Sequence, residues 1–371
     1  MRIGFDGKRA AQNLTGLGNY SRWIIGAASK LYPQNQYLVY TANVKDKPQI
    51  HRFFEREIIE KKLPSSKNFM WRRMGIIKDL IKDRIQIYHG LSQELPFAIQ
   101  HSKIKTVVTV HDLIFLRYPQ YYSWLDRKIY KWKSQTACFV SNKIIAISEN
   151  TKKDIIELYK INPEKVEVIY QSCDDQFKKR LQTAELNQIK DRYNLPEKYI
   201  LYVGTIEGRK NLATLIKALQ SVEESTKLVV VGDKKSYYKK TIVPLVNHLK
   251  LQERILFLEN VDPKDLPGIY QNSKVFVLPS YYEGFGIPII EALYSEIPVI
   301  AATGSCLEEA GGPNSIYVHP DDYMGFSTAI ENVLNDSDLR ENMIDNGKAY
   351  IQKFDSNKLI SQVMDCYNNL K

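Results

Sequence analysis

Short apolar runs alternate along almost the whole chain with longer segments whose apolar residues recur at helical spacing. Apolar runs of roughly four to eight residues are typical of buried parallel strands, and the longer segments are typical of helices that cover a sheet. The pattern therefore predicts an α/β protein built from doubly wound sheets. The predicted strands are Arg2–Asp6, Tyr37–Thr41, Ile85–His89, Thr106–Val110, Lys143–Ile147, Lys165–Tyr170, Tyr199–Val203, Lys227–Val231, Ile255–Leu258, Val275–Leu278 and Pro298–Ala301.

The alternation is interrupted once, by residues 173–198, which are polar and lack a strand pattern. Such a segment is typical of a linker between domains. We therefore predict an N-terminal domain over residues 1–172 and a C-terminal domain over residues 199–356, followed by a last helix over 357–371. The length of 371 residues agrees with this, because it is too long for one ordinary core.

Composition excludes several classes of protein. With 44% hydrophobic and 25% charged residues the chain is neither disordered nor fibrous. It has no apolar run near the roughly 18 residues of a membrane span and no apolar signal-peptide core, so a cytoplasmic location is predicted. Four scattered cysteines without a C-x-x-C pair predict neither a disulfide framework nor a zinc site. The one Asp-x-Asp triplet, Asp336 to Asp338, lies between predicted helices, where capping explains it.

Charge is divided unevenly along the chain. Residues 1–172 contain 29 Lys and Arg against 15 Asp and Glu, a net of +14, whereas the remainder contains 23 against 27, a net of −4. The basic half favours an anionic partner such as a membrane surface or a phosphate-bearing acceptor. No recognised nucleic-acid reader accompanies the charge, so nucleic acid is not predicted.

Residues 45–84 mix cations with apolar and aromatic side chains. An interfacial amphipathic helix, with its apolar residues among lipid headgroups, has this composition. An ordinary helix that covers a sheet and keeps its charged face in water has the same composition. The sequence leaves both interpretations open.

The most informative stretch is YYEGFGIPIIEAL, from Tyr281 to Leu293. It follows a predicted strand, and Pro288 suits the first turn of a helix. Gly284 and Gly286 would let a ligand approach the main chain closely. A strand, a glycine loop and a helix start together present backbone N–H groups and the positive end of a helix dipole to an anion.

Two carboxylates flank this loop, Glu283 before it and Glu291 in the first turn of the predicted helix. Ionised carboxylates accept hydrogen bonds from vicinal sugar hydroxyls, so the loop favours a ligand with both phosphate and polyol parts, such as a nucleotide sugar. Taken singly, the two acids could be a solvated loop residue and a helix-start residue. Two Glu separated by seven residues, with Gly-Phe-Gly-x-Pro between them, resemble the signature of retaining glycosyltransferases of family 4.

A second glycine-containing loop follows Tyr199–Val203 and carries Thr205, Arg209 and Lys210. A forked guanidinium and a compact ammonium at a strand's carboxyl end could neutralise a diphosphate. Surface cations at a helix start would instead be unfavourable beside the positive dipole end. In the resembled family the matching Arg-Lys pair binds the donor diphosphate, which implies a catalytic role for both residues here.

The resemblance also implies roles in the first half. The loop with Gly16 and Gly18 would contact the donor phosphates or the acceptor. Glycines that serve only to form a turn would give the same sequence pattern. It is not a dinucleotide fingerprint, because Ser21 replaces the third glycine. His111 ends an apolar strand where the family has a histidine that approaches the donor sugar, although a lone histidine is more often structural. Asp112 would either bind substrate or cap the next turn.

In the second half the resemblance implies that Glu283 holds sugar hydroxyls and Glu291 the ribose diol. Glu309 aligns with an acid that the family usually has in the loop after Pro298–Ala301. The backbone around the glycine loop would bind the donor phosphates. The residues of that loop are Gly284, Phe285, Gly286 and Ile287.

The implied architecture is GT-B, in which two Rossmann-like domains face each other across a cleft and the last helix packs back on the first domain. The implied reaction is retaining transfer from a nucleotide sugar, without metal or other cofactor. The chain departs from the family where Gly-Val-Asp is usual, having Cys173, Asp174 and Asp175 instead. It looks most like bacterial mannosyltransferases of polysaccharide assembly, which suggests GDP-mannose as donor and a glycan or lipid-linked glycan as acceptor.

Other classes stay open at this point. A non-catalytic carbohydrate-binding relative would share the fold, but the complete phosphate-binding set argues against it. A nucleotide-sugar epimerase or a phosphorylase would also share it, but the paired Glu motif argues against both, and no counterpart of the phosphorylase cofactor lysine is evident. A dehydrogenase would need the first-loop fingerprint that is absent.

Overall fold

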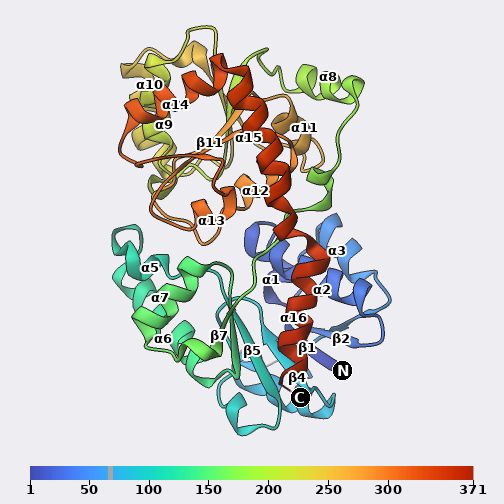
Figure 1. The fold of residues 1–371 in the computed structure, drawn as a ribbon. Helices are drawn as coiled ribbons and strands as arrows, with labels where there is room; N and C mark the ends of the chain where they lie inside the picture. Colours follow the sequence, from blue (N-terminus) through green and yellow to red (C-terminus); the bar gives the residue numbers. More distant parts are fainter. Residues whose placement is uncertain (66–69, 371) are drawn as a thin grey trace. The chain divides into compact units, whose positions relative to one another are not determined.

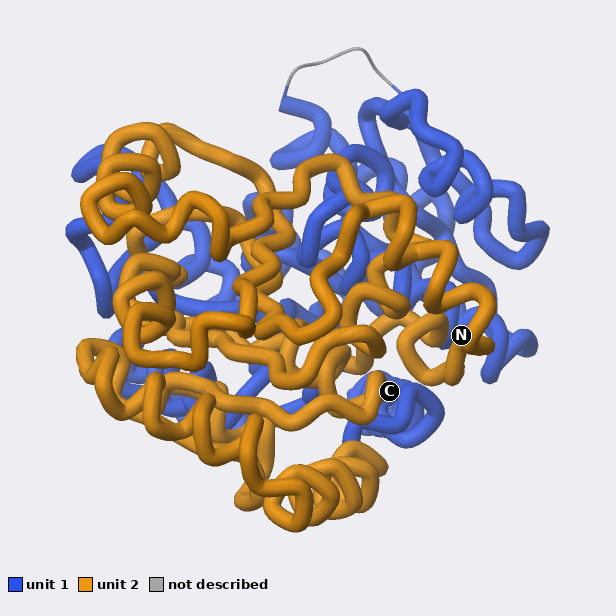
Figure 2. Tube along the Cα trace, turned by 90° about the horizontal axis from the view of Figure 1, so that it is seen from above, with its two compact units in different colours: residues 1–171, 354–371 blue, residues 172–353 orange. Residues whose placement is uncertain are grey.

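The computed structural model describes residues 1–65 and 70–370. Backbone contacts divide the chain into two compact units, coloured separately in Figure 2. Unit 1 comprises Met1–Gln171 and Phe354–Lys371, and unit 2 comprises Ser172–Lys353. Each unit is an α/β structure with its own parallel sheet.

The sheet of unit 1 has seven strands in the order β3-β2-β1-β4-β5-β6-β7, and all neighbouring strands are parallel (Figure 1). The apolar runs form its centre because helices cover both faces. The strands are β1 Arg2–Asp6, β2 Gln36–Tyr40, β3 Ile59–Lys62, β4 Ile87–Gly90, β5 Lys105–Val110, β6 Lys143–Ala146 and β7 Val166–Val168. The helices are α1 Lys8–Gln12, α2 Gly16–Leu31, α3 Pro48–Phe54, α4 Ile76–Lys82, α5 Ile114–Arg117, α6 Trp124–Val140, α7 Glu149–Tyr159 and α16 Ser356–Asn368.

The sheet of unit 2 has six parallel strands in the order β10-β9-β8-β11-β12-β13. Its core is made by strands whose side chains are buried on both faces, such as β11 and β12. The strands are β8 Tyr199–Val203, β9 Lys227–Val231, β10 Ile255–Leu258, β11 Val275–Leu278, β12 Val299–Ala302 and β13 Ile316–Val318. The helices are α8 Thr183–Arg192, α9 Leu212–Ala218, α10 Val243–His248, α11 Leu266–Gln271, α12 Ile287–Tyr294, α13 Leu307–Gly311, α14 Tyr323–Asn335 and α15 Ser337–Tyr350.

Two edge strands, β3 and β13, are absent from the sequence prediction. Each pairs on one side only, β3 with β2 and β13 with β12. β3 reads IEKK and buries only Ile59, and no residue of β13 is fully buried. An edge strand is partly solvated and needs no continuous apolar run, so hydrophobic patterning does not reveal it.

The predicted linker over residues 173–198 is wrong, because most of it is folded against unit 2. α8 packs on α11: the Asn272 side chain donates to the carbonyl of Leu186 (3.2 Å), and Arg192 pairs with Asp265 (2.6 Å). Ile189 is buried beside Gly268, where an added Cβ would lie 2.4 Å from the Ile189 Cδ1 atom. A single buried apolar residue anchors this mostly polar helix, which is why its pattern resembles that of a linker.

Residues 45–84 belong to unit 1, except 66–69, which lie outside the described residues. The aromatic side chains of Phe53 and Trp71 are buried, and so are Ile76 and Leu80. The Trp71 indole donates to the Asp79 carboxylate (2.6 Å). These apolar residues therefore cover the sheet, whereas Ile58, Leu63, Met74 and Ile81 of the same stretch are exposed. Membrane contact by this stretch stays a prediction.

The C-terminal helix α16 belongs to unit 1, where it runs along α2 (Figure 1). The Trp23 indole donates to the Ser356 hydroxyl (2.8 Å). Near its other end the Tyr367 hydroxyl lies 2.6 Å from His89 Nδ1, and His89 Nε2 lies 2.8 Å from the Thr109 hydroxyl. Burial lowers the pKa of His89 to about 3, with a further contribution from His111, so the imidazole is neutral at pH 7.

We expect Tyr367→Phe to lower the free energy of unfolding by about 1 to 3 kcal/mol, because a buried nitrogen of His89 would lose its partner. Urea denaturation followed by circular dichroism measures this. Tyr323→Phe, at an exposed position of α14, is the control and should leave the transition unchanged. Equal midpoints for all three proteins would show that the His89 contact does not stabilise α16.

Candidate functional site

The order of strands reverses in unit 2 between β8 and β11. From β8 the chain proceeds outward to β9 and β10, then returns to place β11 on the other side of β8. The loops after β8 and β11 therefore leave the same sheet edge in opposite directions, and this is where doubly wound sheets bind ligands. The loop after β8 carries Arg209 and Lys210, and the loop after β11 carries Glu283.

The carboxylate of Glu283 is buried between the two cations. Lys210 Nζ lies 2.5 Å from one oxygen and Arg209 Nη1 lies 3.2 Å from the other. Burial alone would raise the pKa of Glu283, but Lys210 and then Arg209 hold it at about 2. The three predicted catalytic residues of unit 2 thus form one ion cluster at the switch point.

Further contacts hold the two loops to each other. Arg209 donates through Nη1 to the carbonyl of Tyr282 and pairs through Nη2 with Glu207 (2.8 Å). The backbone N–H of Tyr281 donates to the carbonyl of Arg209 (3.0 Å). The cationic side chains therefore have fixed positions before any ligand binds.

Two supporting residues were not predicted from the sequence. Asn211, in the left-handed conformation (φ 56°), donates through Nδ2 to the carbonyls of Pro279 (3.0 Å) and Pro320 (2.7 Å). The thiol of Cys306 donates to the carbonyls of Glu283 (3.0 Å) and Phe285 (3.1 Å). An asparagine directly after the Arg-Lys pair is a weak sequence signal, but nothing in the sequence around Cys306 indicates its role.

The glycine loop leads into α12 as the sequence predicts, with Pro288 in its first turn. Gly286 takes φ 115°, a region that favours glycine, and an added Cβ would lie 3.0 Å from Leu307 Cδ2. Phe285 is buried and Gly284 is half-buried. The start of the helix is therefore placed directly after Glu283.

Glu291 lies differently from the prediction. It is the fifth residue of α12, in the second turn and not the first. Tyr270 of α11 donates its hydroxyl to the Glu291 carboxylate (2.9 Å). Burial raises the pKa of Glu291 to about 7; the Tyr270 hydrogen bond opposes this and Asp174 adds to it. The side chain is therefore only partly ionised near neutral pH.

The remaining predicted residues of unit 2 are Glu309 and Thr205. Glu309 lies in the first turn of α13, and its carbonyl accepts a hydrogen bond from Tyr350 (2.8 Å). The carboxylate of its neighbour Glu308 accepts a hydrogen bond from the hydroxyl of Thr303 in the preceding loop. Thr205 is half-buried in the loop that also carries Arg209 and Lys210.

In unit 1 the corresponding reversal of strand order lies between β1 and β4. His111 follows β5, the next strand, and is buried. Its Nε2 lies 2.9 Å from the carbonyl of Leu91, and the ring of Tyr20 meets it edge-on at 4.6 Å. Burial lowers the pKa of His111 to about 4; the Leu91 hydrogen bond opposes this and Arg9 adds to it. The neutral imidazole thus donates to Leu91 through Nε2 and keeps Nδ1 as an acceptor.

Within the described residues, Asp112 and Gly18 of unit 1 have structural roles, whereas none is evident for Gly16. The Asp112 carboxylate accepts from the backbone N–H of Ile114 (3.2 Å) at the start of α5. An added Cβ at Gly18 would lie 1.9 Å from the carbonyl oxygen of Asn13, so packing alone requires glycine there. At Gly16 an added Cβ would meet nothing within 4 Å.

Comparisons with known proteins show which kind of protein has these two units. The family model described as Glycosyltransferase Family 4 matches residues 28–177, and the model described as Glycosyl transferases group 1 matches residues 184–350. The chain belongs to family 4 of the glycosyltransferases. Its two parallel-sheet units are those of the GT-B fold.

The relatives of this glycosyltransferase include sugar transferases of bacterial polysaccharide assembly. It is 29% identical to O-antigen chain mannosyltransferase B of Escherichia coli over 76% of this chain and 74% of that protein. It is also 29% identical to O-antigen chain mannosyltransferase RfbU of Salmonella typhimurium, over 61% of this chain and 60% of that protein. Among solved structures, Anabaena Alr3699/HepE in complex with UDP and glucose has a TM-score of 0.76 at 17% identity, with both chains fully covered.

Two further observations concern the Asp-x-Asp triplet, a candidate metal-binding motif, and the search for membrane-spanning helices. Asp336 caps α15 by accepting from the N–H of Leu339 (2.8 Å), the role that the sequence suggested for the Asp-x-Asp triplet. In the part of the glycosyltransferase that the structure describes, no helix is long and apolar enough to cross a bilayer.

The raised pKa of Glu291 predicts a pH-dependent stability. A carboxyl whose folded pKa exceeds its unfolded value stabilises the fold at low pH, and this contribution is lost as the pH rises through the folded pKa. Glu291→Gln should therefore gain stability relative to the wild type as the pH rises from 5 to 8. Thermal melting across this range measures the difference. Glu253→Gln, at an exposed position, should show none, and a constant offset for Glu291→Gln would contradict the burial argument.

Proposed function

We propose that this glycosyltransferase moves a hexose from a nucleotide-diphosphate sugar to a glycan or lipid-linked glycan acceptor in cell-surface polysaccharide synthesis, with retention of anomeric configuration. The observation that carries the proposal is the buried Glu283 carboxylate between Arg209 and Lys210 at the strand switch point of unit 2. This arrangement places two cations and a carboxylate beside the start of α12.

The cations suit the chemistry of the leaving group. Glycosyl transfer breaks the bond between the anomeric carbon and a phosphate oxygen, so negative charge grows on the departing diphosphate. Cations and N–H groups that are already positioned stabilise such charge without reorganising during the reaction. Arg209 and Lys210 fulfil this condition because the loops hold them through several hydrogen bonds. We therefore propose that transfer needs no metal ion.

The acid and the histidine have different roles in this scheme. Glu283 is fully ionised at neutral pH, so it accepts hydrogen bonds from sugar hydroxyls. His111, which is neutral, would contact the donor sugar through its accepting nitrogen. We propose a front-face substitution with an oxocarbenium-like transition state. The acceptor oxygen bonds to the anomeric carbon as the bond to the phosphate oxygen breaks, and the leaving phosphate takes the acceptor proton.

GDP-mannose is our proposal for the donor. The support is the naming of several relatives as mannosyltransferases, including proteins from Escherichia coli and Salmonella typhimurium. Solved relatives of the same fold are described with UDP instead, at 17% to 18% identity. The donor base is therefore the first property to measure.

The basic charge of residues 1–172 supports an anionic membrane surface as a further partner, with the enzyme peripheral on the cytoplasmic face. A lipid-linked acceptor would be presented at such a surface.

We expect one nucleoside diphosphate, GDP, to bind the purified protein in the presence of EDTA. Lys210→Ala should weaken this binding about tenfold to a hundredfold, because one charge-assisted contact to the phosphates is lost. Isothermal calorimetry with GDP, UDP, dTDP and ADP measures both effects. Lys235→Ala, which removes an exposed cation from the same region, is the matched control. Binding only after addition of a divalent metal would refute metal independence, and tighter UDP binding would refute the GDP assignment.

Glu283→Gln should reduce turnover about a hundredfold, because the neutral side chain stabilises the transition state less. It should not weaken binding of the nucleoside diphosphate alone, since the substitution releases Arg209 and Lys210 to the phosphates. Product analysis by NMR gives the rate and the anomeric configuration. Unchanged turnover would remove Glu283 from the catalytic set, and an inverted product would exclude the retaining mechanism.

A further inference from the structure

The outward face of α6 in unit 1 is apolar. Leu125, Trp132 and Phe139 are spaced by seven residues and therefore lie along one side of the helix. They are 60%, 52% and 55% exposed, and Trp124 at the helix start is 68% exposed. The opposite side, with Ser134, Ala137 and Cys138, packs on the sheet.

This pattern is unusual for a helix that covers a sheet, whose outer side is normally polar. Single exposed apolar residues are common on protein surfaces, but a continuous row rimmed by charge marks an interaction surface. Two of the four residues are tryptophans, whose amphipathic rings favour the interface between apolar and aqueous phases.

The same helix is basic. Between Trp124 and Val140 it has four Lys and Arg against one Asp, a net of +3. Lys128 lies within the apolar row, with its Nζ 5.4 Å from the centre of the Trp124 ring. Lys131 is also exposed, one turn further along. Cations are therefore distributed along the apolar face itself.

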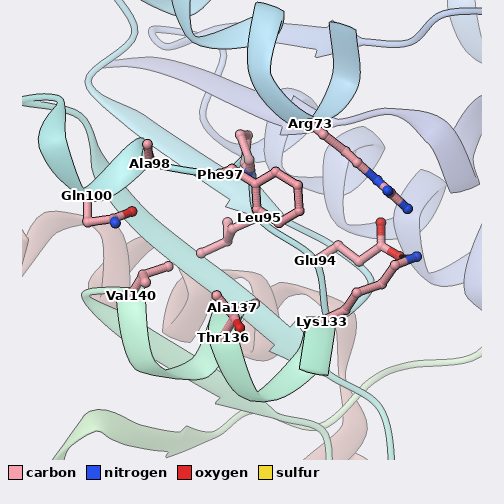
Figure 3. Close-up of a pocket in the computed structure, with 11 residues that line it drawn as sticks. Arg73, Glu94, Leu95, Phe97, Ala98, Gln100, Lys133, Thr136, Ala137 and Val140 are labelled. Atoms are coloured by element: carbon pink, nitrogen blue, oxygen red, sulfur yellow. Dashed lines mark hydrogen bonds and ion pairs between the residues drawn. The ribbon is translucent and has the colours of Figure 1, made fainter. Parts of the chain in front are cut away.

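A cavity of about 200 Å³ lies on the flank of α6. Its walls are mainly apolar, with Leu95, Phe97 and Val140 among them, whereas Arg73, Glu94 and Lys133 gather at one end (Figure 3). Lys133 pairs with Glu94 (3.1 Å), and the backbone carbonyl of Arg73 accepts a hydrogen bond from the N–H of Phe97 (2.7 Å). Trp132 packs on Phe97 with ring centres 5.3 Å apart, so the cavity adjoins the outward face.

We propose that the outward face of α6 docks on an anionic lipid surface, with Trp124, Leu125, Trp132 and Phe139 among the headgroups and the adjoining cavity receiving part of one lipid. Lysines within an apolar row contact anionic headgroups while their stems stay among apolar groups. The cavity matches an anionic amphiphile, since it offers apolar walls and a cationic end. A second copy of the chain fits less well, because a symmetric contact would bring the lysines of both copies together.

The proposal is independent of the transfer reaction and assigns the membrane contact to α6 in place of residues 45–84. It is tested by sedimenting the full-length protein with vesicles of phosphatidylcholine alone or with phosphatidylglycerol. The wild type should bind only the anionic vesicles, and less at high salt. The double variant Trp132→Gln/Phe139→Gln should bind at least tenfold less.

Matched control variants distinguish binding by the outward face of α6 from a general effect of positive charge or of exposed apolar residues. Ile81→Gln removes an exposed apolar residue from α4 of the same unit and should bind like the wild type. Lys128→Glu/Lys131→Glu should lose binding, whereas Lys103→Glu/Lys105→Glu, with the same change of charge at exposed positions, should lose much less. Nucleotide titration shows that each variant is folded and tests the proposed transfer function separately.

Three results would overturn the proposal. The first is a wild type that sediments with neither kind of vesicle, and the second is a Trp132→Gln/Phe139→Gln variant that binds as well as the wild type. Analytical ultracentrifugation without vesicles gives the third: a wild-type dimer that this variant dissociates would show that a second copy covers the face.

Discussion

The buried charge of Glu283 is the constraint on which the geometry of the site in unit 2 depends. Removing a carboxylate from water costs several kcal/mol unless cations and hydrogen bonds compensate. Arg209 and Lys210 compensate from the loop of the neighbouring strand, so the two loops must keep a fixed register. A diphosphate would compete with Glu283 for the same cations. Under the proposed function, ligand binding and the position of the acid would therefore be coupled: as phosphate attracted the cations, the carboxylate would become available to sugar hydroxyls.

The sequence predicts the centre of each sheet much better than its edges. β8, β9 and β11 have the predicted bounds, because interior parallel strands read as apolar runs. The edge strand β10 is also predicted, because all four of its residues, ILFL, are apolar. β3 and β13 escape prediction because half of their hydrogen-bonding edge is solvated. The folded segment with α8 escapes it for a related reason, since a helix anchored mainly by Ile189 has the composition of a linker. The hydrophobic pattern of an element reflects how much of that element is buried, and β3, β13 and α8 bury little of their surface.

Within the site, sequence order predicts residues in the loops that follow strands. Arg209, Lys210 and Glu283 are of this kind, because parallel strands end at one edge of the sheet. Cys306 and Asn211 support the same loops through contacts with residues more than twenty positions away, which no local pattern encodes. Glu291 shows a third case. Its spacing is visible in the sequence, but its raised pKa depends on burial against α11 and on Tyr270.

The cationic side chains are arranged differently in the two parts of the chain. The acidic second half uses Arg209 and Lys210 in a compact cluster, where burial strengthens their interaction with a small anion. The basic first half has its lysines on exposed positions of α6, where each acts weakly and is screened by salt. Dispersed cations of this kind are effective only against an extended anion that contacts many of them at once. In our proposals the first arrangement binds a soluble donor and the second a membrane surface, so the charge asymmetry would reflect the different sizes of the two anions.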